Sequence, residues 1–213
     1  MSLQIGDTAP DFSADTTDGR INFHEWLGDG WGILFSHPAD FTPICTTELG
    51  RTALLKDEFA RRNTKVAFVS VGSLDQHKKW VKDINQTQKC TVNFPVIADP
   101  EHKVAELYGM IHPKASSTAP VRSVFFIGPD KTIKATLTYP ASTGRNYAEI
   151  LRVVDSLQLT ATYSVGTPVD WKVGEEVVIS TAISDKDIPA KFPKGHRVVN
   201  SYLRYTPQPT DRK

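Results

Sequence analysis

Residues 31–50 read WGILFSHPADFTPICTTELG and combine a strand signal with a helix start. The first seven residues form a short apolar run that ends at a proline, which is typical of a buried strand. After a polar loop, Thr42 is a good helix N-cap, and Pro43 suits the first helical position because the N–H that it lacks needs no partner there. We therefore predict a strand, a loop and a helix with Cys45 in its first turn.

Outward from this stretch, apolar runs alternate with helix-like segments. Further strands are expected at residues 65–73, 94–98, 121–127 and 132–139, and helices at 43–63, 75–85, 99–107 and 146–159. Four apolar residues of the helix expected at 43–63 would face the core: Leu49, Leu54, Leu55 and Phe59. Turn residues 128–131 predict a hairpin between the last two strands. The order predicts an α/β layer fold, compatible with a thioredoxin-like core among others.

After Leu159 the character of the chain changes to short strands and loops, such as residues 177–179. We place a domain boundary near Ala161, which separates a first domain, residues 1–161, from a C-terminal domain, residues 162–213.

Charge and cysteine content exclude several classes of protein. Lys plus Arg is 25 and Asp plus Glu is 24, so neither nucleic acid nor an anionic membrane is expected as the main partner. No apolar run approaches about 18 residues, so no membrane span is expected. The N-terminus lacks signal-peptide character, which favours the cytoplasm. Cys45 and Cys90 form no C-x-x-C, which excludes a zinc ribbon and a thioredoxin-type dithiol, and two cysteines in a chain of this size exclude a disulfide scaffold.

Cys45 is the candidate reactive residue. Its sulfur would lie near unpaired backbone N–H groups and the positive end of a helix dipole, which favours the thiolate. A buried cysteine that packs as a small apolar residue is the alternative. The proline, the loop and the Thr-Pro-x-Cys helix start favour the reactive interpretation.

The same segment resembles the active-site pattern of the peroxiredoxins, P-x-x-x-[TS]-x-x-C, with Pro38, Thr42 and Cys45 in register. It is most similar to the 1-Cys, peroxiredoxin-6-type subfamily of the AhpC/TSA family. Five further segments share that similarity: FHEWLGD (23–29), YPASTGRN (139–146), ILRVVDSLQLT (150–160), TPVDW (167–171) and YLRYTPQP (202–209). The resemblance implies a thioredoxin-like three-layer α/β/α core with a smaller C-terminal strand-and-loop segment.

The resemblance also implies a thiol peroxidase for hydrogen peroxide and organic hydroperoxides, acting in antioxidant defence. Cys45 matches the peroxidatic cysteine, which becomes a sulfenic acid. Thr42 matches the hydroxyl that hydrogen-bonds the thiolate and the peroxide, and Pro38 the proline that shields the site from water. Arg122 matches the arginine that favours the thiolate and stabilises charge on the leaving oxygen.

Two further matches leave alternatives open. Arg145 matches a second active-site arginine, but from its position alone a surface ion pair at a helix start is preferred. His37 matches a histidine close to the reactive sulfur, and a hydrogen-bonded histidine at a strand end explains it equally well.

The implied cycle uses one cysteine, since Cys90 is not at a resolving position and reads as structural or incidental. An external thiol or another small reductant would reduce the sulfenic acid: glutathione with a transferase, ascorbate or another thiol. No cofactor and no metal are expected, and the resemblance implies a homodimer in which the C-terminal segment reaches over the partner. Without a reductant, oxidation continues to sulfinic acid.

Some members of the subfamily also have phospholipase activity, assigned to a serine in G-D-S-W-G with a histidine and an aspartate. Here Gly30 occupies the serine position, and His24 and Asp130 match the other two. Because glycine offers no nucleophile, we predict no serine-type phospholipase activity.

Two other classes of function compete with the enzyme. One is a peroxide sensor in which oxidised Cys45 signals to a partner, although such sensors commonly keep a resolving cysteine nearby. The other is a holdase-like oligomer whose activity would not need Cys45.

Overall fold

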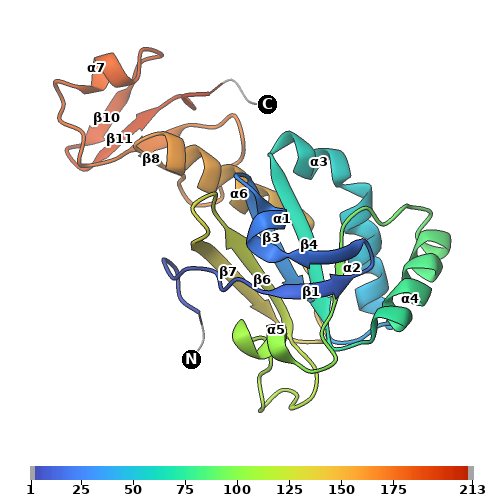
Figure 1. The fold of residues 1–213 in the computed structure, drawn as a ribbon. Helices are drawn as coiled ribbons and strands as arrows, with labels where there is room; N and C mark the ends of the chain where they lie inside the picture. Colours follow the sequence, from blue (N-terminus) through green and yellow to red (C-terminus); the bar gives the residue numbers. More distant parts are fainter. Residues whose placement is uncertain (1–2, 211–213) are drawn as a thin grey trace. The chain divides into compact units, whose positions relative to one another are not determined.

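A computed structural model describes residues 3–210 of the chain (Figure 1). The chain divides into two units, of which the first ends at Tyr147 and the second begins at Ala148. The domain boundary predicted near residue 161 lies close to the end of helix α6 (Tyr147–Thr162) and stays a prediction.

The first unit is built on a seven-stranded sheet in the order β2-β1-β5-β4-β3-β6-β7. Its parallel centre consists of β3 (Trp31–Ser36), β4 (Thr64–Ser70) and β5 (Val96–Ala98). The antiparallel strands are β1 (Ser13–Thr16) and β2 (Gly19–Asn22) at one edge, and β6 (Arg122–Ile127) and β7 (Ile133–Tyr139) at the other. The central strands are nearly continuous apolar runs because both faces of the sheet are covered.

Helices cover the two faces. On one face, α1 (Phe23–Leu27) and α5 (Lys103–Leu107) share an apolar cluster with Leu34 and Ala67 of the sheet. Neighbouring residues in a strand point to opposite faces. Phe35 and Phe68 therefore face the other way, and their rings stack at 4.7 Å.

The opposite face is covered by α2 (Pro43–Leu54), α4 (Leu74–Thr87) and the short α3 (Lys56–Arg61). Trp80 of α4 is fully buried, with its ring 5.0 Å from that of His37, which in turn lies 6.0 Å from Phe68. The three-layer α/β/α core is thus confirmed, and the turn after β6 forms the predicted hairpin with β7.

Two local predictions were wrong. The single helix expected at 43–63 is divided at Leu55 into α2 and α3. Leu54, expected to face the core together with Leu55, is 58% exposed, because within α2 it points about 140° away from the buried Leu49, at 100° per residue. The hairpin of β1 and β2 was not predicted at all.

The second unit combines α6 with a four-stranded sheet in the order β10-β11-β9-β8. The strands are β8 (Val165–Gly166), β9 (Val177–Ile179), β10 (Arg197–Asn200) and β11 (Leu203–Thr206), and α7 (Ile188–Lys191) lies between β9 and β10 in the chain. Trp171, Val177 and Phe192 belong to its own apolar cluster. The short strands predicted after residue 160, including 177–179, are confirmed. Within residues 3–210, no helix has the length and apolar character needed to cross a bilayer.

Candidate active site

Cys45 lies in the first turn of α2, and none of its surface is exposed. The helix begins as predicted, with Thr42 as the N-cap residue in extended conformation and Pro43 at the first position. The Thr42 hydroxyl donates back into the loop, to the Ala39 carbonyl at 2.9 Å, rather than into the helix. The first backbone N–H groups of α2 therefore stay available, and with the helix dipole they favour negative charge on the sulfur.

Arg122 of β6 reaches this sulfur from the sheet. Its Nη1 lies 3.3 Å from Cys45 Sγ and 2.8 Å from Glu48 Oε2. Nε and Nη2 donate to the Ala141 carbonyl at 3.0 and 2.8 Å. The guanidinium is thus fixed from two sides, with one N–H corner directed at the sulfur.

Arg145 joins the same network through Glu48. Its backbone N–H and its Nε donate to Glu48 Oε1 at 2.9 and 3.0 Å, and Nη2 pairs with Oε2. Nη1 donates to the carbonyls of Ser36 and Ser123. The side chain of Arg145 is fully buried, so the alternative of a surface ion pair is wrong.

Among residues 3–210, Glu48 carries the only negative charge in hydrogen-bonding contact with these two arginines. Burial by itself would raise the pKa of its carboxyl, but hydrogen bonds and charge from Arg145, together with the charge of Arg122, hold that pKa below its ordinary value. One carboxylate against two guanidinium groups leaves one uncompensated positive charge. A thiolate on Cys45 would neutralise it.

The hydrogen-bond network of Glu48 extends further into the core through its backbone carbonyl. Tyr147 donates to the Glu48 carbonyl at 3.0 Å and shares a 2.6 Å hydrogen bond with Thr52. Burial raises the pKa of the Tyr147 phenol to about 12, so it stays a neutral donor. The Arg145 guanidinium also lies 5.0 Å from the ring centre of Phe35, a cation–π contact that further fixes its position.

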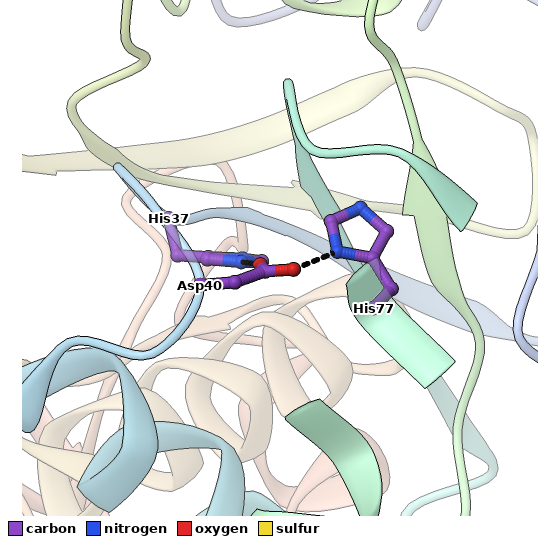
Figure 2. Close-up of side chains that lie close together, drawn as sticks. All are labelled: His37, Asp40 and His77. Carbon is purple, nitrogen blue, oxygen red and sulfur yellow. Dashed lines mark hydrogen bonds and ion pairs between the residues drawn. The ribbon is translucent and has the colours of Figure 1, made fainter. Parts of the chain in front are cut away.

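A second buried cluster joins the loop between β3 and α2 to helix α4 (Figure 2). His37 Nε2 is 3.0 Å from Asp40 Oδ1, and His77 Nδ1 of α4 is 2.6 Å from Asp40 Oδ2. Burial lowers the pKa of His37, only partly opposed by Asp40. Pro38 and Thr42, both half-buried, lie on the same loop. His37 is thus hydrogen-bonded at a strand end, and its match to a histidine close to the reactive sulfur stays a prediction.

Trp80 links this loop to the start of α2. Its indole N–H donates to the Thr46 hydroxyl at 3.2 Å, one residue after Cys45, while its ring lies against His37. A shift in the first turn of α2 would therefore change the hydrogen bond and the packing of Trp80.

His37, Asp40 and His77 are the one group of described residues whose ligand atoms approach each other as metal ligands do. A metal-bound histidine usually donates its outer N–H to a partner. The outer nitrogens, His37 Nδ1 and His77 Nε2, have no partner among residues 3–210. The cluster therefore fits a hydrogen-bonded triad better than a metal centre.

Sequence reasoning missed Glu48, Asp40 and His77. Glu48 follows Cys45 by three residues and so shares its helix face, which was a usable signal. Asp40 and His77 lie 37 residues apart in polar stretches, and the sequence gives no sign that they meet.

The residues that match the phospholipase pattern have local partners. His24 Nε2 bonds the Ala9 carbonyl at 2.8 Å, and Asp130 accepts from Lys134 at 2.7 Å in the β6–β7 turn. A Cβ on Gly30 would lie 3.1 Å from the Asn63 carbonyl oxygen, so any side chain there would need Asn63 to give way.

Cys90 lies apart from this chemistry. It follows α4, is half-buried, and burial raises the pKa of its thiol. Neither cysteine of the chain, both within the described residues, forms a disulfide.

Comparison with known proteins gives consistent matches. Residues 5–136 match the model of the AhpC/TSA family. The chain is 56% identical to a "1-Cys peroxiredoxin" of Dictyostelium discoideum over 97% of this chain and 86% of that protein. It is 53% identical to "Peroxiredoxin-6" of Mus musculus, over 97% and 98% of the two chains.

Two solved structures are similar along nearly the whole chain. A mutant of peroxiredoxin 6 of Arenicola marina superposes with a TM-score of 0.91 at 43% identity, covering 99% of this chain and 100% of that one. A yeast mitochondrial 1-Cys peroxiredoxin, described with a thiol resolving mechanism via glutathione/thioredoxin systems, gives 0.89 at 45% identity, covering 96% and 99%.

Proposed function

Since the chain belongs to the AhpC/TSA family, as a 1-Cys-type peroxiredoxin and hence a thiol peroxidase, we propose that Cys45 is its peroxidatic cysteine. The observation that carries the proposal is the position of Arg122, whose Nη1 lies 3.3 Å from the buried Cys45 sulfur. A cation held this close both favours the thiolate and meets the charge that develops when an O–O bond breaks.

In the proposed step the Cys45 thiolate attacks the terminal oxygen of a hydroperoxide. The S–O bond forms as the O–O bond breaks, which leaves a sulfenic acid and an alkoxide or hydroxide that takes a proton from solvent. Arg122, fixed by Glu48 and the Ala141 carbonyl, stabilises the negative charge without having to reorient. Pro38 shields the sulfur from water, and the Thr42 hydroxyl, which donates its proton to the Ala39 carbonyl, orients the peroxide by accepting a hydrogen bond from it.

The sulfenic acid is then reduced by an external thiol. One thiol condenses with it to a mixed disulfide and water, and a second thiol displaces the cysteine. The mechanism described for the yeast relative supports glutathione or thioredoxin as the reductant class. Cys90, half-buried with a raised thiol pKa, takes no part.

The decisive measurement is the intact mass of the protein after one equivalent of hydrogen peroxide for about a second, followed by alkylation of free thiols. Wild type, Cys45→Ser and Cys90→Ser are compared. We expect one added oxygen in wild type and Cys90→Ser, and none in Cys45→Ser. A Cys45–Cys90 disulfide, or two unoxidised thiols, would contradict the proposal. Loss of catalytic turnover in Cys45→Ser also separates the enzyme from a holdase.

We further propose that the chain is a cytoplasmic homodimer without serine-type phospholipase activity. Gly30 offers no nucleophile, and His24 and Asp130 are engaged by neighbours. Release of free fatty acid from phosphatidylcholine by the pure protein, abolished by His24→Ala, would overturn the last point.

A further inference from the structure

The Asp40 carboxylate joins helix α4 to the loop that precedes Cys45 (Figure 2). His77, fully buried on α4, lies with Nδ1 2.6 Å from one oxygen of Asp40, and His37 Nε2 lies 3.0 Å from the other. Hydrogen bonds from both histidines outweigh the effect of burial and lower the pKa of Asp40, so the bridging group is an anion. Two elements distant in sequence are thus tied at one point.

The arrangement lowers the stability of the folded protein, because it leaves one nitrogen of each histidine without a hydrogen bond among the described residues. When each ring donates toward Asp40, its second nitrogen is left as an acceptor, and neither His37 Nδ1 nor His77 Nε2 has a partner within residues 3–210. A buried unpaired acceptor is unfavourable, and an apolar core at this place would avoid it.

The loop itself is strained where Asp40 anchors it. Phe41, between Asp40 and Thr42, has φ of +53°, a left-handed conformation that a bulky aromatic residue rarely adopts. Such strain persists only where the surroundings enforce it. Packing on the other side is equally tight, since a Cβ on Gly72 would lie 2.8 Å from His77 Cε1 and 3.2 Å from Asp40 Oδ2.

We propose that His77 is a positioning residue of the peroxidase site, which acts through Asp40 to hold loop 37–42 in the geometry that peroxide reduction needs. The inference rests on the proposed function, because that loop carries Pro38 and Thr42. His77 has no hydrogen bond to Cys45, Glu48 or either active-site arginine. It therefore affects how a peroxide is held, and leaves thiolate formation at Cys45 to Arg122.

The test compares two reactions of Cys45 in wild type, His77→Leu and His77→Asn. Oxidation by hydrogen peroxide needs the positioned loop, whereas alkylation by iodoacetamide needs only an accessible thiolate. Asparagine keeps a donor near the place of His Nδ1, and leucine keeps similar bulk without one. We expect His77→Leu to slow peroxide oxidation about ten- to a hundredfold, the equivalent of one lost hydrogen bond to a charged group, with alkylation changed less than about twofold. His77→Asn should recover most of the peroxide rate.

Two further variants separate a specific effect on loop 37–42 from a general loss of folded protein. Gly72→Ala places a methyl group against the His77 ring from outside the loop. It should therefore also slow peroxide oxidation while leaving alkylation nearly unchanged. Ile84→Val creates a small defect in the buried face of α4, seven residues away, and should slow neither reaction. Parallel loss of both reactions, failure of His77→Asn to recover, or an unchanged peroxide rate in His77→Leu would overturn the inference. If wild-type Cys45 is not oxidised at all, the proposed function fails instead.

Discussion

At Glu48 a single carboxylate holds two arginines that come from distant parts of the chain. Both pairs are almost completely buried. Breaking a buried ion pair leaves an uncompensated charge and typically costs about 3–5 kcal/mol. We therefore expect Glu48→Gln to lower the free energy of unfolding by about that amount, measured by urea denaturation.

Glu58 provides the matched control for that experiment. It pairs with Arg61 and Arg62 on the surface, and its side chain is one-third exposed. Exposed pairs contribute about 0–1 kcal/mol. If Glu58→Gln destabilises the protein as much as Glu48→Gln, burial does not decide the strength of the Glu48 network.

His37 predicts a pH dependence of stability. Its pKa is lowered in the folded protein by burial, whereas in the unfolded chain it is about 6.5. Below about pH 6.5 the unfolded state thus binds more protons, and stability falls as pH falls, by up to about 1.4 kcal/mol per pH unit. His37→Gln should flatten the unfolding free energy between about pH 7 and 5. The carboxylates with lowered pKa, Asp40 and Glu48, act mainly below that window. An unchanged slope in the variant would show that His37 does not titrate in this way.

The residues of the site differ in how far the sequence could reveal them. Local chemistry alone predicts Cys45 as the reactive residue, since a helix start is a local feature. Arg145 was not, because its burial depends on Glu48, 97 residues earlier in the chain. A polar residue with a distant partner leaves no periodic signal, and for that reason Asp40 and His77 were also missed.

Among the helices and strands, the break at Leu55 shows that the spacing of apolar residues does not determine where one helix ends and the next begins. In a continuous helix Leu55 would point about 120° away from Leu49, at 100° per residue. The chain resolves this conflict by ending α2 and starting α3, so that both leucines are buried. The apolar pattern predicted helical structure correctly, but it could not show that the helix is interrupted at Leu55.

Substitution of the two adjacent leucines, Leu54 and Leu55, tests whether the helix is interrupted at this point. Leu55 is 8% exposed and Leu54 is 58% exposed. Leu55→Ala should lower the free energy of unfolding by about 2–5 kcal/mol, as for other buried leucines. Leu54→Ala should change it by less than about 0.5 kcal/mol. Equal losses in urea denaturation would mean that the helix continues through Leu55.

The hairpin of β1 and β2 left a signal that was not used. Asp18 and Gly19 lie between two short polar-apolar alternations, and Asp-Gly is a strong turn signal. Gly19 has φ of +106°, a conformation that favours glycine. Short strands with little apolar character are the hardest elements to predict.

For the molecule as a whole, the order of strands and helices predicted an α/β layer fold, and the three-layer α/β/α arrangement came from the resemblance to a family. The C-terminal part was predicted only as short strands and loops. Its four short strands form one sheet, which packs on a small apolar cluster of its own, and such short strands carry too little pattern to predict how they pair. The resemblance to a family, rather than the pattern, gave the thioredoxin-like topology and the function.

The proposed homodimer makes a prediction at this scale. Strand β10 is exposed along its whole length, with Val198 and Val199 60% and 58% exposed. Light scattering should give about twice the chain mass of 23.6 kDa. If the C-terminal segment forms the interface, Val198→Asp with Val199→Asp should halve that mass and leave the unfolding of the monomer unchanged. A monomeric wild type would contradict the proposal.

The contact of Trp80 with Thr46 has an optical consequence. This indole is fully buried, donates to the residue that follows Cys45, and lies against His37. Its emission is therefore sensitive to the electrostatic field and the packing at the start of α2, next to the proposed peroxidatic Cys45. Mixing the protein with peroxide in a stopped-flow fluorimeter should show a change that Trp80→Phe removes, although Trp26, Trp31 and Trp171 remain. The enzyme thus contains its own reporter, and each chemical stage at Cys45 can be timed without a label.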